Sequence, residues 1–67
     1  MKKSDLKVGD RIIQISEGAG SGMPLEITDI DTEYGIIGMG VYFCSIDGAE
    51  KHHKYIRLDG TLEDITD

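Results

Sequence analysis

The chain has 67 residues and a net charge of −6 at pH 7, with 13 acidic side chains against 7 basic ones. This length is close to the lower limit for a self-supporting hydrophobic core, so the sequence predicts a single domain over residues 1–67 and excludes multidomain or large-pocket enzymes. Trp is absent and aromatic residues make up only 6%, so the core must be built from Ile, Leu, Val and Met.

The cysteine content and the N-terminal sequence bear on the cellular compartment. Cys44 is the only cysteine, which rules out an intramolecular disulfide, whereas small secreted domains usually carry several. No apolar run follows Lys2 and Lys3, as a signal peptide would require. The longest near-apolar stretch, residues 35–44, is about half of the ~20 residues that a membrane helix needs. We therefore expect a cytoplasmic protein with no membrane partner.

The glycines and the β-branched residues predict short strands joined by turns. Nine glycines interrupt the chain, and helical periodicity is nowhere sustained for the roughly ten residues of a typical helix. Residues 11–15 form the first predicted strand, with Ile13 and Ile15 on one face and Ile12 on the other. A glycine-rich loop follows at residues 17–22.

The second and third predicted strands carry most of the apolar residues in the middle of the chain. Residues 23–31 form the second strand, and a bend near Thr28 and Asp29 would turn Ile30 back towards the inside. Residues 36–45 form the third and longest strand, which has apolar side chains on both faces. One of these faces is expected to carry Ile37, Met39, Val41 and Phe43.

Turn residues and a short apolar tail complete the prediction. Ile46, Asp47 and Gly48 indicate a hairpin-type turn, because Asp-Gly is a strong turn signal. Residues 53–58 form a fourth strand, and residues 62–65 fit a single 3₁₀ turn or a short closing strand.

Three segments together resemble a known family of small barrels. They are Val8-Gly9-Asp10-Arg11-Ile12, Glu26-Ile27-Thr28-Asp29-Ile30-Asp31 and Tyr55-Ile56-Arg57-Leu58. The pattern is similar to the SH3-like barrels, and more narrowly to the KOW-type and translation-protein-type barrels. The resemblance implies an all-β fold, a small SH3-like barrel of four to five short antiparallel strands with a 3₁₀ turn near the C-terminus. It also implies a binding module, because such barrels serve as adaptors and as nucleic-acid or ribosome contacts.

The distribution of charge points to a partner. Residues 17–50 contain seven carboxylates and no Lys or Arg, a surface that attracts basic partners and repels phosphates. In the simplest interpretation these carboxylates only keep the domain soluble. The leading functional hypothesis is a small acidic, non-enzymatic binding module that acts through protein–protein interaction, as a regulator or inhibitor encoded by a phage or mobile element. Its partner would carry a basic surface, and the expected contact residues are Glu26, Asp29, Asp31, Glu33 and, as an aromatic anchor, Tyr34.

Two other functions stay open from the sequence. The first is an RNA- or ribosome-contacting module whose basic and aromatic strand includes His53, Lys54, Tyr55 and Arg57. The net negative charge makes nucleic acid the less favoured partner. The second is a homo-oligomeric barrel that holds a small ligand at a subunit interface, which the apolar residues 36–44 suggest.

No motif predicts a cofactor, a metal or a catalytic group. The glycines of residues 18–22 are followed by a predicted strand, whereas a phosphate-binding loop needs a helix there. The acidic turn after Asp29 lacks the glycine and the twelfth-position carboxylate of a calcium loop. His52 and His53 would point to opposite faces of a strand, so we expect two exposed histidines rather than a metal site. Cys44 is expected to be a small packed side chain.

Overall fold

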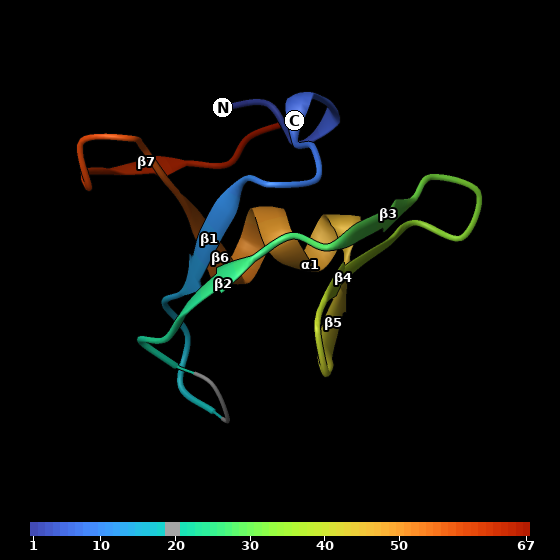
Figure 1. Cartoon of the computed structure of the whole chain (residues 1–67), viewed down its shortest axis with the longest axis horizontal. Coiled ribbons are helices and arrows are strands. Elements are labelled where there is room, and N and C mark those ends of the chain that lie inside the picture. Colours follow the sequence, from blue (N-terminus) through green and yellow to red (C-terminus); the bar gives the residue numbers. More distant parts are fainter. Residues whose placement is uncertain (19–20) are drawn as a thin grey trace.

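Short strands make up most of the regular structure. The computed structural model describes residues 1–18 and 21–67, and within them the chain forms seven strands, one α-helix and one 3₁₀ turn (Figure 1). The all-β class expected from the sequence is confirmed. The elements in chain order are η1 (Lys3–Asp5), β1 (Arg11–Gln14), β2 (Pro24–Glu26), β3 (Asp29–Asp31), β4 (Ile36–Met39), β5 (Tyr42–Ser45), α1 (Ile46–His52), β6 (His53–Ile56) and β7 (Leu62–Asp64).

The strands form two antiparallel sheets, and they do not close into one barrel in the part of the chain that the structure describes. One sheet has the order β2-β1-β6-β7, and the other has the order β3-β4-β5. The helix α1 connects β5 to β6 and packs against both strands. Figure 1 shows the two sheets spreading apart towards the lower part of the view. The closed form implied by the resemblance is therefore not found.

A bent segment passes from one sheet to the other. Ile27 still belongs to the first sheet, because its N–H donates to the carbonyl O of Asp10 at 2.8 Å. The next residue, Thr28, belongs to the second sheet, because its N–H donates to the carbonyl O of Gly38 at 2.8 Å. The bend expected near Thr28 is confirmed, and it divides the predicted second strand into β2 and β3. Ile27 itself is fully buried at this crossing point.

The burial of Ile12 shows which face of the first sheet is turned towards the core. Its side chain is fully buried, whereas Ile13 is half-buried and Ile15, just beyond β1, is 51% exposed. Ile12 pairs across the sheet with Leu25 on one side and Tyr55 on the other, and both pack against the core. The predicted alternation is confirmed, and the core combines this face with the inner face of the second sheet. Its buried apolar residues are Leu6, Ile12, Ile27, Ile37, Met39, Ala49 and Ile65.

Residues 36–45 form two strands joined by a tight turn, so the prediction of one long strand is wrong. Gly40, with a φ of +71°, and Val41 make the two-residue connection between β4 and β5. Because the chain reverses here, the side chains expected on one face separate. Ile37 is buried, whereas Val41 and Phe43 are 90% and 77% exposed.

The helix α1 stands where the sequence predicted a hairpin turn at residues 46–48. Ser45 is its N-cap, and its Oγ accepts a hydrogen bond from the backbone N–H of Gly48 at 2.8 Å. Asp47 in the first turn and Lys51 in the last turn complement the helix dipole. The Asp-Gly pair therefore lies in the first turn of a capped helix, and the hairpin prediction is wrong.

The C-terminal region adds a strand to the first sheet. β6 ends at Ile56, two residues before the predicted end, and β7 pairs with it. Of the two forms predicted for residues 62–65, the closing strand is the one present, so the 3₁₀ turn expected there is not found. The 3₁₀ turn is instead η1, where the N–H of Lys3 donates to the carbonyl O of Thr66 at 2.8 Å. The two terminal segments consequently lie side by side (Figure 1).

Candidate functional site

The solvent-facing side of the β3-β4-β5 sheet is the leading candidate surface, and we call it the outer face. Cross-strand pairing places its residues in two rows. The opposite side of the same sheet carries Ile30, Ile37 and Cys44, which pack in or against the core. The first row of the outer face is Asp29, Gly38 and Phe43, and the second row is Asp31, Ile36 and Ser45.

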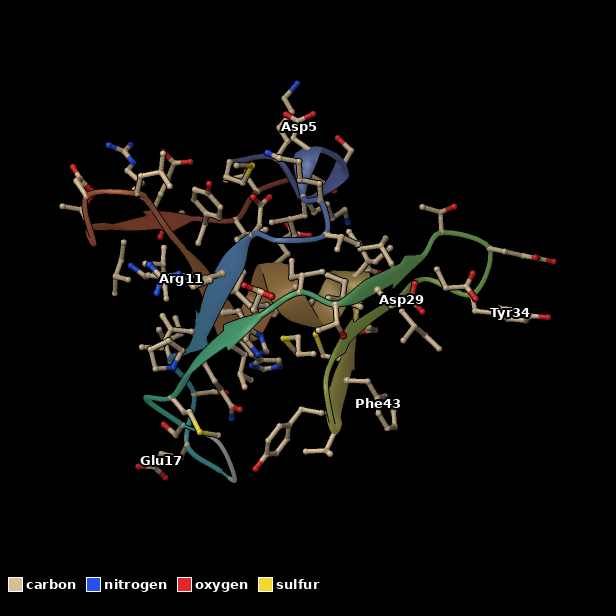
Figure 2. All side chains as sticks on the ribbon, in the orientation of Figure 1. Asp5, Arg11, Glu17, Asp29, Tyr34 and Phe43 are labelled. Atoms are coloured by element: carbon tan, nitrogen blue, oxygen red, sulfur yellow. The ribbon has the colours of Figure 1, made fainter. Side chains whose placement is uncertain are left out.

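Phe43 is the most prominent apolar group of the outer face. Its side chain is 77% exposed, and Ile36 in the neighbouring row is 39% exposed. Gly38 separates Phe43 from Asp29, and a Cβ on Gly38 would stand 3.4 Å from the Cβ of Asp29. In this row, Gly38 therefore leaves a position without a side chain between the ring of Phe43 and the carboxylate of Asp29. Figure 2 shows Phe43 projecting from β5 on the same side of the molecule as Asp29 and Tyr34.

The β3–β4 turn extends the outer face with further acidic and aromatic groups. The Oδ1 of Asp31 accepts hydrogen bonds from the N–H of Glu33 at 3.0 Å and from the N–H of Tyr34 at 3.2 Å. This carboxylate fixes the turn, and Gly35 completes it with a φ of +66°. Glu33 is exposed, and Tyr34 is 72% exposed at the tip.

Four of the five residues predicted for protein binding thus lie on one hairpin, which contains Asp29, Asp31, Glu33 and Tyr34. The fifth, Glu26, lies on β2 in the other sheet, directly across from Arg11. Sequence reasoning missed Phe43, because alternation along an unbroken strand placed it on the same face as Ile37 and Met39. Gly40 was the available signal, since a glycine at the first position of a two-residue connection is typical of a tight hairpin turn.

The residues of the predicted nucleic-acid strand are engaged within the domain. The Nζ of Lys54 lies 3.1 Å from the Oδ1 of Asp64 on β7. The Nε of Arg57 donates to the Oε1 of Glu63 at 3.0 Å, and Glu63 raises the pKa of this guanidinium further. Tyr55 is partly buried against the core. These side chains adjoin one another on β6 and the turn after it, but their charges are balanced by β7.

His53 is buried, which corrects the expectation of two exposed histidines. Its side chain is only 7% exposed, whereas His52 is exposed. The reason is local: His53 follows the last residue of α1 and pairs with Gln14 of the central strand β1, so it turns inwards. Burial lowers the pKa of His53 below its ordinary value, and a hydrogen bond involving the backbone of Gly48 acts in the opposite direction.

Cys44 is half-buried on the inner side of β5, as expected for a packed side chain. Burial raises the pKa of its thiol, which favours the less nucleophilic protonated form. Within residues 1–18 and 21–67, no three His, Cys, Asp or Glu side chains are grouped to hold a metal ion. Of the glycine loop at residues 17–22, Ala19 and Gly20 lie outside the described residues.

Comparison with protein-family models, with curated proteins and with solved structures finds no match for this chain. In the described part of the chain, no helix is both long enough and apolar enough to span a bilayer.

Proposed function

We propose that this chain is a small binding module that acts through protein–protein contact, with the outer face as its docking surface. The observation that carries the proposal is Phe43, a large aromatic side chain left 77% exposed on β5, the edge strand of a regular sheet. Exposed aromatic groups on a rigid element are typical anchors of protein interfaces, because their burial gains much apolar contact at little entropic cost. Ile36 in the next row enlarges the apolar area.

The charge around Phe43 defines the kind of partner. Asp29 and Asp31 share its face, and Glu33 stands in the adjoining turn. Residues 17–50 contain no Lys or Arg to neutralise them. The complementary partner is a protein surface with Lys or Arg side chains around an apolar side chain. Such a pairing would speed association and set orientation, while the apolar contact would supply affinity.

A role as a regulator or inhibitor is compatible with this proposal, because covering a basic surface on another protein requires only binding. The proposed function gives no residue a catalytic role, and we propose that the domain is non-enzymatic. Nucleic acid is the less favoured partner, since the cations that would contact phosphate, Lys54 and Arg57, already pair with Asp64 and Glu63.

The test is affinity capture from a bacterial lysate with matched charge variants. The interface variant is Asp29→Lys with Glu33→Lys, which leaves the turn-fixing carboxylate of Asp31 in place. The control variant is Asp5→Lys with Asp67→Lys, which changes net charge equally at exposed positions away from the outer face; Figure 2 shows Asp5 on the far side of the molecule from Phe43. Each capture is run with and without nuclease and read by mass spectrometry.

The proposal predicts a protein that survives nuclease, binds the control variant and is lost with the interface variant and with Phe43→Ser. Equal loss with both charge variants would mean that only net charge matters, and it would overturn the outer face as the site. Partners that vanish with nuclease would move the function to nucleic-acid contact through β6.

A further inference from the structure

A hollow of about 370 Å³ opens between the two sheets, and it shares Phe43 with the outer face. Its walls come from the end of β1 with the residues that follow it, from β5, and from the junction of α1 and β6. Leu25 and Met39 supply aliphatic surface, and Tyr42 and Phe43 supply aromatic rings. Hollows that combine apolar and aromatic surface with a few polar groups are common binding sites for small ligands.

The wall at the junction of α1 and β6 contains an unusual polar group, His53. Its backbone N–H donates to the carbonyl O of Ala49 at the end of α1, so the residue is held firmly. Its side chain is 7% exposed. The ring has a hydrogen bond that involves the backbone of Gly48, and its buried Nδ1 has no partner at hydrogen-bond geometry among residues 1–18 and 21–67. Buried polar atoms are nearly always bonded, so an unpartnered one beside a hollow points to a ligand group.

The chemistry of that group follows from the protonation of the ring. Burial lowers the pKa of His53, so the imidazole is neutral near pH 7. A neutral imidazole has one nitrogen that carries a lone pair. In the tautomer with its proton on Nε2, Nδ1 of His53 is an acceptor and requires a donor from the ligand.

The charge of the hollow favours a cation. Glu17 is the one Asp, Glu, Lys or Arg among the described residues that line it. The rings of Tyr42 and Phe43 add negative faces that attract cations. An anionic ligand would meet the carboxylate of Glu17 with no compensating positive charge in the described lining.

We propose that this hollow binds a guanidinium group, the cation carried by arginine. A guanidinium is planar, stacks on aromatic rings, is weakly hydrated and presents several N–H donors in a fixed fork. It can therefore stack against Tyr42 or Phe43, donate to Nδ1 of His53 and face the carboxylate of Glu17. A lysine ammonium is a strongly hydrated point charge and loses more by entering a partly apolar site.

The test is an NMR titration of the full chain with small blocked amino acids. The probe is Nα-acetyl-arginine methylamide, its neutral isostere is the citrulline derivative, and a lysine derivative tests the shape of the cation. We expect a dissociation constant of about 1 mM for the arginine probe and at least tenfold weaker binding of the other two. The ¹⁵N signal of Nδ1 in His53 should shift with the arginine probe alone.

Because His53 is buried, replacing it could unfold the domain, so the test uses variants of exposed residues instead. Glu17→Gln and Tyr42→Leu should each weaken binding of the arginine probe about threefold to tenfold. Glu26→Gln and Tyr34→Leu, which alter the same residue types away from the hollow, should leave it unchanged. Equal binding of the arginine and citrulline probes, or no shift at His53, would overturn the proposal.

The guanidinium group could come from an arginine side chain of a protein or from a small metabolite, and a titration with free arginine distinguishes these two sources. Equal binding of free and blocked arginine would assign the site to an arginine side chain of a protein. Tighter binding of the free amino acid, by tenfold or more, would assign it to a small metabolite. The proposals for the hollow and for the outer face can be rejected independently, because the probe titration needs no protein partner.

Discussion

Thr28 and Gly38 are joined by two hydrogen bonds that share one oxygen. The carbonyl O of Gly38 accepts the backbone N–H of Thr28 at 2.8 Å and its hydroxyl at 3.2 Å. The same hydroxyl accepts the N–H of Gly40 at 3.1 Å. One side chain thus ties the start of β3 to the β4–β5 turn, and it fixes the spacing between Asp29 and Phe43 on the outer face.

Replacing Thr28 by Val should therefore destabilise the domain although Val is a good strand residue. Both hydroxyl bonds are lost, and we expect a decrease of about 1 kcal/mol in the free energy of unfolding. Thr28→Ser keeps the hydroxyl and should cost less. Urea unfolding measures both changes, and a Val variant at least as stable as the Ser variant would show that the hydroxyl is not important.

Ser45 and Gly48 should show strong coupling in a double-mutant cycle. Ser45→Ala removes the N-cap of α1 and should cost about 1 kcal/mol. Gly to Ala within a helix usually gains up to about 1 kcal/mol, but here a Cβ on Gly48 would stand 2.8 Å from the Oγ of Ser45. We expect Gly48→Ala to stabilise only when Ser45 is already Ala. Equal effects in both backgrounds would contradict the clash.

The stability of the domain should depend on pH through His53. Because burial lowers its pKa from the ordinary 6.5, the unfolded chain binds more protons than the folded one between that value and the lowered pKa. The contribution of the neutral ring is complete above pH 6.5 and is lost as pH falls through the lowered pKa. Urea midpoints should be flat from about pH 8 to 7 and decline below about 6.5. His53→Gln should flatten this decline, and His52→Gln should preserve it.

Lys3 should act as an electrostatic tie between three segments. Its Nζ lies 2.7 Å from Asp47, 3.1 Å from Glu50 and 2.9 Å from Asp67. The hydrogen bond to Asp47 is the largest cause of the raised pKa of Lys3, and it lowers the pKa of Asp47. We expect Lys3→Met to raise the pKa of Asp47 towards its ordinary value and to reduce the thermal midpoint, less so in high salt. Lys2→Met makes the same charge change and should do neither.

Local pattern was enough to predict β1, β6 and the closing strand β7, and to group the carboxylates around residues 29–33. Alternation placed Ile12 opposite Ile13, and its break at Ile30 predicted the bend near Thr28, where the structure shows the chain passing from one sheet to the other. Asp29 and Asp31 could be grouped because residues two apart on a strand share a face. These features depend on neighbours within a few positions, which a sequence displays directly.

The features that failed depend on contacts across the fold. The Asp-Gly of residues 47–48 fits a turn or a first helical turn equally well, and the burial of Ala49 against the rest of the core accompanies the helix. The burial of His53 follows from its pairing with Gln14, far away in sequence. The exposure of Phe43 depends on a reversal at Gly40 that leaves no mark in the alternation of apolar residues.

The bent segment that serves both sheets also limits how this sequence can vary. Ile27 faces the core of one sheet and Ile30 packs on the core from the other, with two residues between them. One inserted residue there would reverse the orientation of every side chain on β3, burying Asp29 and Asp31 and exposing Ile30. A change in the length of this stretch is therefore more disruptive than a substitution at one of its exposed positions, so related sequences should keep the distance from Pro24 to Asp31 fixed while their loops grow or shrink.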